Sequence, residues 1–301
     1  MLFFAGIDIG GTKTAIGVYD EKMQPVTDRR FATEASCGPS QLFDRIKSAI
    51  IEIENNCGLK ISAAGVCTPG PISISEGKIV YIASIDWHDV PVVSRLSQDL
   101  NIPVSFDNDT NIAAYAERFL GAGKNLPAGK GNLIYITVST GVGAGVIVDD
   151  NIVHGARDWA GEFGHIRLRP GGLLCSCGND GCLEAYASGT AIAKATGISA
   201  IEAAALAKAN DSHCIQVFND MATVLGQGIS ILIQLYDPQV IALGGGLTHA
   251  WSLFEKILFQ EIEKGVYKNS MQDISVTPTA LGSDAGCLGA ALLARKHFFD
   301  Q

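Results

Sequence analysis

The sequence predicts an α/β protein made of two lobes, and three observations support this prediction. Strand-like and helix-like segments alternate along the chain, which is the pattern of α/β proteins. The chain has 301 residues, whereas a single hydrophobic core stops growing at about 250–300 residues, so two lobes are expected. Both halves also open with a strand, a glycine turn and a second strand, over residues 7–18 and 134–148.

The first half alternates apolar strands with amphipathic helices. Its opening hairpin follows from an apolar run that reaches Asp8, a turn with two glycines, and a second apolar run. A helix is expected over residues 40–55, because apolar residues recur every three or four positions behind Ser40, a suitable cap. The predicted elements are strands over 2–9, 14–19, 61–67 and 104–106 and helices over 40–55, 92–100 and 110–120.

The second half begins after residues 121–131, a glycine-rich stretch that predicts a loop or a lobe boundary. We therefore expect an N-terminal lobe over residues 1–120 and a larger C-terminal lobe over residues 121–285. The predicted elements of this half are strands over 133–138, 145–148, 152–154, 240–243 and 274–278 and helices over 198–209, 220–235, 251–264 and 286–298.

Composition and charge argue against several classes of protein. The chain has 31 acidic and 22 basic residues and a net charge of −9, whereas a surface that binds duplex DNA needs clustered Lys and Arg. Hydrophobic residues make up 47% of the sequence, which is enough to fill a core. No uncharged run reaches the ~20 apolar residues of a membrane helix. The N-terminus lacks the basic start of a signal peptide, so a cytoplasmic protein is expected.

Three glycine turns that follow strands are candidates for nucleotide binding. In the first, Asp8 precedes Gly10-Gly11-Thr12-Lys13; backbone N–H groups and the Thr hydroxyl bind phosphate well, and the acid is a Mg²⁺ ligand. The others are Ser139-Thr140-Gly141-Val142-Gly143 and Gly244-Gly245-Gly246. Each alone is equally explained as a tight turn, and none is a Walker A loop. Together they predict a nucleotide between two lobes.

A polar cluster, Asp107-Asn108-Asp109-Thr110-Asn111, lies at a predicted strand-to-helix junction. Asn108 or Asp109 would make a good helix cap, which is the simplest explanation. A cap does not need this density of polar groups, however. An Asp at such a strand end is also suited to orient a sugar hydroxyl and accept its proton during phosphoryl transfer.

The strongest signal is a cysteine cluster that follows Gly161-Glu162-Phe163-Gly164-His165. His165 with Cys175, Cys177 and Cys182 matches the ligand set of a tetrahedral Cys₃His zinc site, and thiolates select Zn²⁺ over Mg²⁺. Three buried thiols or a redox pair are the alternatives, and the spacing is not C-x-x-C. Four protein ligands close the coordination shell, so the zinc is expected to be structural.

The same region offers polar groups for a sugar. If one ring nitrogen of His165 binds zinc, the other is available to a ligand. Glu162 and Glu184 flank the cluster in sequence, and carboxylates with an imidazole suit vicinal hydroxyls. Either acid alone is better explained as a solvated surface residue. The remaining cysteines are interpreted as reduced, mostly buried hydrophobic residues: Cys37, Cys57, Cys67, Cys214 and Cys287.

These motifs, in this order, resemble the ROK family of bacterial sugar kinases and sugar-responsive repressors. The resemblance covers nearly the whole chain. It implies two actin-like (RNase H-like) lobes, ATP and sugar in the cleft between them, and a final helix, 286–301, that returns to the N-terminal lobe. The matching segments are Asp8–Lys13, Thr68–Pro71, Asn108–Asn111, Thr140–Gly143, Gly161–His165, Cys175–Glu184, Leu243–Gly246 and Ser283–Gly286.

Carried over by position, the resemblance implies a role for each candidate residue. Asp109 is similar to the catalytic base, and His165, Cys175, Cys177 and Cys182 to the zinc ligands. The implied sugar ligands are Asn108, Glu162, His165 and Glu184. The residues implied to face ATP and Mg²⁺ are Asp8, Gly11, Thr12, Lys13, Thr140, Gly141, Gly245 and Gly246. Members often carry Glu where Asp107 stands and Gly where Ser139 stands, and neither change removes a group with an implied role.

Three functions follow from these expectations. The first is an ATP-dependent hexose kinase, acting at the 6-hydroxyl, with glucose or an N-acetylhexosamine favoured over fructose or mannose. The second is a sugar-responsive repressor. The resemblance implies that such a repressor carries a helix-turn-helix module ahead of the sugar lobe, and this is not expected here because the Asp8 motif begins within ten residues of Met1. The third is a sugar-binding protein without catalysis. A homodimer is expected from the resemblance, and nucleic acid or membrane partners are not.

Overall fold

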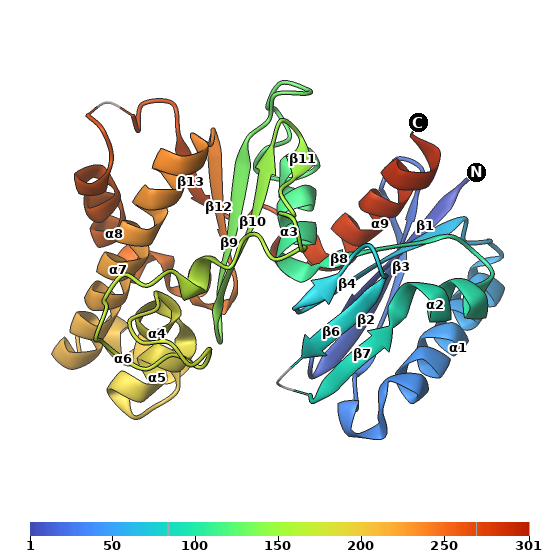
Figure 1. The fold of residues 1–301 in the computed structure, drawn as a ribbon, viewed down its shortest axis with the longest axis horizontal. Helices are drawn as coiled ribbons and strands as arrows, with labels where there is room; N and C mark the ends of the chain where they lie inside the picture. Colours follow the sequence, from blue (N-terminus) through green and yellow to red (C-terminus); the bar gives the residue numbers. More distant parts are fainter. Residues whose placement is uncertain (83–84, 269, 301) are drawn as a thin grey trace. The chain divides into compact units, whose positions relative to one another are not determined.

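The computed structural model describes residues 1–82, 85–268 and 270–300. The chain forms two compact units (Figure 1). Unit 1 comprises Met1–Glu117, His154–Ala160 and Ser283–Gln301, and unit 2 comprises Arg118–Val153 and Gly161–Gly282. The short segment His154–Ala160 therefore belongs to unit 1, although the predicted division at residue 120 assigns it to the second lobe.

Strands and helices alternate through both units. The strands are β1 (Phe3–Ile9), β2 (Lys13–Asp20), β3 (Pro25–Ala32), β4 (Ala63–Thr68), β5 (Ile72–Ser73), β6 (Lys78–Ile82), β7 (Trp87–Pro91), β8 (Val104–Asn108), β9 (Leu133–Val138), β10 (Val142–Val148), β11 (Asn151–Ile152), β12 (Val240–Gly244) and β13 (Ser275–Pro278). The α-helices are α1 (Pro39–Cys57), α2 (Val92–Leu100), α3 (Asp109–Phe119), α4 (Glu184–Ala187), α5 (Gly189–Thr196), α6 (Ala200–Lys208), α7 (Ser212–Tyr236), α8 (Trp251–Gly265) and α9 (Ala285–Phe299).

The main sheet of unit 1 has the order β3-β2-β1-β4-β8. Strand β1 runs antiparallel to β2 and parallel to β4, and β4 runs parallel to β8. Parallel strands end at the same edge of a sheet. The register therefore places Asp8 level with Cys67 on β4, and Cys67 level with Asp107 on β8.

Helix α9 brings the C-terminal part of the chain onto this sheet. It packs against β1 and β4, at a point where Gly6 and Gly65 are paired across the two strands. A β carbon on Gly6 would collide with the backbone of Cys287, and one on Gly65 would collide with the backbone of Ala290. Any larger residue at these two positions would force the helix away from the sheet.

The sheet of unit 2 repeats the arrangement of the sheet in unit 1. Its order is β11-β10-β9-β12-β13, with β9 antiparallel to β10 and parallel to β12, which runs parallel to β13. Helices α7 and α8 pack against each other, and Phe218, Phe254 and Leu258 are fully buried in their core. The α/β expectation and the similarity of the two halves are both confirmed.

Several elements differ from the sequence predictions, each for a local reason. Strand β3 was not predicted, because its residues are mostly exposed and it carries Asp28, Arg29 and Arg30 instead of an apolar run. Helix α7 begins at Ser212, eight residues before the predicted start, because Asp211 caps it by accepting the N–H of Cys214 at 2.9 Å. The short strands β5 to β7 and helix α5 were also missed.

The helical segments were compared with the requirements of a membrane span. Among the described residues, no single helix has the length and apolar composition to cross a membrane, and one bent pair, α5 with α6, reaches those limits only when both are counted together.

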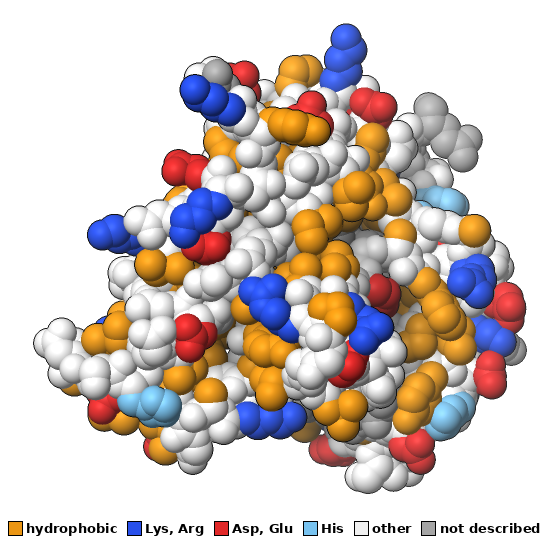
Figure 2. All heavy atoms as spheres, turned by 60° about the vertical axis from the view of Figure 1, so that its left-hand side comes forward, with side chains coloured by type: hydrophobic (Ala, Val, Ile, Leu, Met, Phe, Trp, Pro, Cys, Tyr) orange, Lys and Arg blue, Asp and Glu red, His pale blue; other side chains and the backbone are white. Residues whose placement is uncertain are grey.

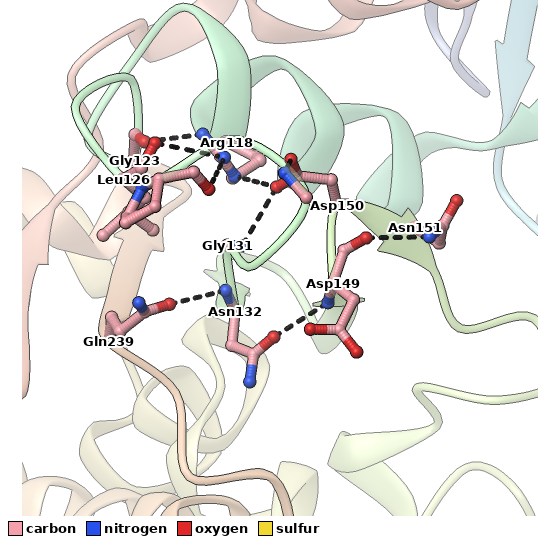
Figure 3. Close-up of polar contacts among 11 residues, drawn as sticks. Arg118, Gly123, Leu126, Gly131, Asn132, Asp149, Asp150, Asn151 and Gln239 are labelled. Atoms are coloured by element: carbon pink, nitrogen blue, oxygen red, sulfur yellow. Dashed lines mark hydrogen bonds and ion pairs between the residues drawn. The ribbon is translucent and has the colours of Figure 1, made fainter.

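A buried ion pair organises the loop after α3 in unit 2 (Figure 3). Arg118 is 2% exposed, and its Nε lies 2.5 Å from Oδ1 of Asp150. The same guanidinium donates to the carbonyl oxygens of Gly123 at 2.9 Å and Pro127 at 3.0 Å. Asp150 in turn accepts the N–H of Gly129 at 2.5 Å. The glycine-rich loop 121–131 is therefore folded around one charge pair.

Replacement of Arg118 by Met is expected to lower the free energy of unfolding by about 3–5 kcal/mol, because the carboxylate of Asp150 stays buried without its cation. Urea unfolding followed by circular dichroism measures this change. The matched control is Arg29→Met, because Arg29 and Glu52 form an ion pair whose side chains are about half exposed. An exposed ion pair of this kind contributes about 0–1 kcal/mol to the free energy of unfolding. Equal effects of the two substitutions would contradict the prediction.

Candidate functional site

In unit 1, the carboxyl ends of β1, β4 and β8 carry the polar residues that the sequence singled out. Asp8 is near the end of β1, Thr68 ends β4 and Asn108 ends β8. Thr68 and Asn108 are register partners on parallel strands, so their side chains lie on the same face of the sheet. The Thr68 hydroxyl is buried and has no hydrogen-bond partner within the described part of the chain, which suits a bound ligand or water.

The junction of β8 and α3 holds the predicted catalytic base. Helix α3 begins at Asp109, and Asn108 acts as its cap, since its Oδ1 accepts the N–H of Thr110 at 2.9 Å. Asp109 accepts the same N–H at 2.8 Å. Both residues are only partly buried. The capping role that we considered for Asn108 is therefore real, and it holds Asp109 in the first turn of a helix, where the helix dipole favours the charged carboxylate.

Asp107 stabilises the junction of β8 and α3 through hydrogen bonds to its carboxylate. Its side chain is 3% exposed, and its Oδ1 accepts the backbone N–H of Asn108 at 2.7 Å and the Nδ2 N–H of Asn111 at 2.9 Å. The Nε2 atom of His154 lies 2.7 Å from the other oxygen, Oδ2. The sequence analysis did not single out His154, which is 47 residues from Asp107 and has no motif around it.

Asp8 lies in a cavity of unit 1 at the first glycine turn. The cavity has a volume of about 480 Å³, and Gly10, Lys13, Arg30 and Ser283 also line it. Burial raises the pKa of the Asp8 carboxyl above its usual value, against the opposing effects of Cys67 and Lys13. A partly desolvated carboxylate of this kind fits a divalent cation, which would offset the cost of its charge.

In unit 2, the other two glycine turns line one cavity of about 800 Å³. Thr140 contributes from the turn between β9 and β10, and Gly246 and Leu247 contribute from the turn after β12. The φ angle of Gly245 is +87°, and a β carbon there would lie 2.5 Å from the carbonyl oxygen of Val138, so only glycine fits this turn. Ile201 on α6 forms an apolar part of the cavity wall.

The predicted zinc ligands come together in unit 2. One potential ligand atom from each of His165, Cys175, Cys177 and Cys182 lies within 4.8 Å of the other three. The Sγ atoms of Cys177 and Cys182 are 3.7 Å apart, and two thiolates bound to one tetrahedral zinc lie about 3.8 Å apart for Zn–S bonds of about 2.3 Å. The Asn179 N–H lowers the pKa of the Cys177 thiol, which favours the thiolate that a metal needs. The four residues therefore fit a structural Zn²⁺.

His165 faces two groups at once. Its Nδ1 lies 3.6 Å from the sulfur of Cys175, and its Nε2 lies 3.9 Å from a carboxylate oxygen of Glu162. With Nδ1 on the metal side, Nε2 points toward Glu162, as expected for a ring that serves both a metal and a second group. The side chain of Glu162 is 63% exposed, so its carboxylate is accessible from solvent.

Glu184 connects the zinc region to the second glycine turn. Its Oε2 accepts the backbone N–H of Val142 at 2.9 Å, and its Oε1 accepts the hydroxyl of Ser176 at 3.3 Å. Ser176 lies between two of the predicted zinc ligands, and Val142 follows Thr140-Gly141. Glu184 was predicted from the sequence but its contact with Val142 was not, because the two residues are 42 positions apart.

The structure thus divides the predicted residues into two groups. Unit 1 holds Asp8, Gly11, Thr12, Lys13, Asn108 and Asp109. Unit 2 holds Thr140, Gly141, Glu162, His165, Cys175, Cys177, Cys182, Glu184, Gly245 and Gly246. Within unit 2, the predicted zinc ligands form one cluster, and Thr140 and Gly246 line one cavity.

Known proteins share both the sequence pattern and the fold. A glucokinase from Streptomyces coelicolor is 32% identical over 97% of this chain and 97% of its own length. An N-acetylmannosamine kinase from Yersinia pestis is 30% identical over 96% of this chain and 97% of its own length. A xylose repressor from Bacillus subtilis is 31% identical over 79% of this chain, which spans 62% of that protein.

Solved structures match over the whole length. The ROK hexokinase from Thermus thermophilus superposes with a TM-score of 0.86 at 31% identity and covers 100% of both chains. The ROK family glucokinase from Streptomyces griseus, solved in complex with glucose and AMPPNP, has a TM-score of 0.81 at 31% identity and covers 98% of this chain and 99% of its own.

The repeated sheet order and these matching structures define a protein of the two-lobe, actin-like class. The ROK family model matches residues 4–297, and the chain belongs to the ROK family. The resemblance read from the motifs is confirmed.

Proposed function

We propose that this protein is an ATP-dependent sugar kinase that phosphorylates a hexose at its 6-hydroxyl group. The observation that carries the proposal is Asp109, held in the first turn of α3 beside a braced Asn108. The alignment with glucokinases over 97% of the chain supports it, as does the similarity to a glucokinase solved with glucose and AMPPNP.

In the proposed reaction Asp109 orients the sugar hydroxyl and accepts its proton while the phosphoryl group is transferred. Asn108, Glu162, His165 and Glu184 bind the other hydroxyl groups of the sugar. Backbone N–H groups of the glycine turns stabilise the charge on the transferring phosphoryl group. Because Glu184 also accepts the N–H of Val142, the same carboxylate keeps the second glycine turn in place.

The glycine turns are the proposed nucleotide-binding segments. The cavity bounded by Gly246, Leu247 and Ile201 is large and apolar enough for an adenine ring. Gly11, Thr12, Lys13, Thr140 and Gly141 are the proposed phosphate contacts. Asp8 is the proposed side chain near Mg²⁺, which compensates the phosphate charge when bound. Zn²⁺ at the Cys₃His cluster holds His165 and takes no part in the chemistry.

An ADP-release assay over a panel of hexoses tests this proposal. The panel contains glucose, N-acetylglucosamine, N-acetylmannosamine, fructose, mannose and allose. We expect the highest kcat/KM for glucose or an N-acetylhexosamine, because relatives of both kinds align along nearly the whole chain. Absence of sugar-dependent ADP release across the whole panel would refute the kinase proposal. A preference for fructose or mannose would refute only the ranking.

A sugar-responsive regulator is the second candidate, favoured by the 31% identity to a xylose repressor. The face drawn in Figure 2 shows basic side chains interspersed with acidic ones, not a continuous basic stripe, and the net charge is −9. Sequence-specific DNA binding at physiological salt, released by a sugar and unaffected by Asp109→Asn, would support the regulator. Sugar binding without ADP release or DNA binding would support a non-catalytic binding protein.

The homodimer stays a prediction, which light scattering tests.

A further inference from the structure

The Asp107 carboxylate is buried, and the proposed reaction gives it no direct part. It accepts the backbone N–H of Asn108 and the side-chain amide of Asn111, at 2.7 and 2.9 Å. These two donors stand on either side of Asp109 in the sequence, one at the end of β8 and one in the first turn of α3. The position of Asp107 therefore sets the course of the backbone through Asn108 and Asp109.

His154 contacts the second carboxylate oxygen of Asp107, Oδ2. The Nε2 atom lies 2.7 Å from Oδ2, within the range of a strong charge-assisted hydrogen bond. The His154 side chain is 33% exposed, whereas that of Asp107 is 3% exposed. The pair thus connects a buried carboxylate to a ring nearer the surface.

The His154 ring is itself fixed by its own segment. The segment His154–Ala160 closes on itself, because the N–H of Ala160 donates to the carbonyl oxygen of His154 at 3.0 Å. It is also attached to the residue that follows β5, because Oδ2 of Asp158 accepts the N–H of Ile74 at 2.9 Å. The histidine is therefore presented to Asp107 by a closed loop with a second anchor.

We propose that His154 is a positioning residue for phosphoryl transfer: by holding Asp107, it fixes the Asn108-Asp109 turn in the geometry that proton transfer requires. This inference rests on the proposed function, in which Asp109 is the base. A displacement of about 1 Å in a reacting group costs about 100-fold in rate, so the support that Asp107 gives, two residues before the base, has a direct effect on kcat.

Protonation of His154 adds a dependence on pH. Burial lowers the pKa of His154, but the hydrogen bond and charge of Asp107, with the charge of Asp158, outweigh it and raise the pKa above its usual value. Among the described residues, the charges that act on the ring are Asp107 on β8 and Asp158 on its own segment. A group with a raised pKa stabilises the fold at low pH and loses that effect as pH rises through the folded-state pKa. The brace is therefore strongest when His154 is charged.

Two substitutions at His154 and one elsewhere test the inference. For His154→Ala we expect kcat to fall by about 10- to 100-fold, with KM for the sugar changed much less, because the sugar ligands are intact. For His154→Gln we expect most of the wild-type kcat, because the side-chain amide can still donate a hydrogen bond to Asp107. The matched control is His88→Gln, since His88 forms an exposed pair with Asp86 at 3.1 Å in the same unit; this variant should behave as wild type.

The pH profile separates positioning from a merely structural role. The wild-type kcat should decline on the alkaline side as His154 loses its proton, and His154→Gln should lack that decline, because its side chain does not titrate. If His154→Ala does not fold, as judged by circular dichroism, the profile of His154→Gln decides. A folded His154→Ala with wild-type kcat, or an unchanged alkaline decline in His154→Gln, would overturn the inference.

NMR titration of the imidazole gives a readout that needs no activity. The pKa of His154 should fall in Asp107→Asn, and no change would overturn the pairing on which the inference depends. A wild-type protein without kinase activity would overturn the proposed function and this inference together. An active enzyme that is indifferent to His154 would overturn the inference alone.

Discussion

Replacement of Asp109 by Asn is expected to lower kcat by about 10²–10⁴-fold, the usual contribution of a general base. Asn has nearly the same shape as Asp and keeps an oxygen that accepts the Thr110 N–H, now 2.8 Å from Asp109, so the first turn of α3 should persist. It has no basic group to take the sugar proton. Steady-state kinetics gives kcat, and calorimetry should show sugar binding within about threefold of wild type, since a general base acts on the transition state more than on binding.

The matched control for this substitution is Asp211→Asn. Asp211 also stands at the start of a helix and accepts a backbone N–H, that of Cys214, and Asn is an equally good cap. The control should retain wild-type kcat. If Asp109→Asn kept more than about a tenth of wild-type kcat, the gain expected from a general base would be missing and the assignment of Asp109 would be wrong.

Replacement of Cys182 by Ser is expected to abolish both metal binding and activity. The four ligands of the cluster lie within 4.8 Å of one another, and Cys182 is fully buried. Zinc binding by such sites contributes about 10–16 kcal/mol of apparent free energy, most of which is folding free energy of the surrounding loop. Loss of the metal would release His165. It would also release Ser176, which lies between Cys175 and Cys177 in the sequence and contacts Glu184.

Elemental analysis should find about one zinc per wild-type chain, as a single Cys₃His site requires, and chelation should remove sugar binding together with activity. Cys214→Ser is the matched control, because Cys214 is equally buried in unit 2 but lies on α7, outside the cluster. The Cys214→Ser variant should bind zinc as the wild type does. A fully active protein without zinc would show that the cluster is not a structural metal site.

The family and most of the candidate residues were predictable from the sequence because they lie in short, contiguous motifs. A glycine turn after an apolar strand, or four soft ligands within 18 residues from His165 to Cys182, needs no distant partner to be recognised. The fold class followed in the same way from the alternation of elements. Exposed or short elements such as β3 and β7 escaped prediction, because their residues carry no clear periodicity of burial.

The pairings between distant residues were decided only by the tertiary structure. His154 meets Asp107 across 47 residues, Glu184 meets Val142 across 42, and Arg118 meets Asp150 across 32. None of these residues has a local pattern that names its partner, because a hydrogen bond or ion pair depends on the approach of two atoms in space and not on their spacing in the chain. The sequence by itself determined the family, the glycine turns and the candidate ligands of a zinc ion. The fold decided which buried groups hold those motifs in position.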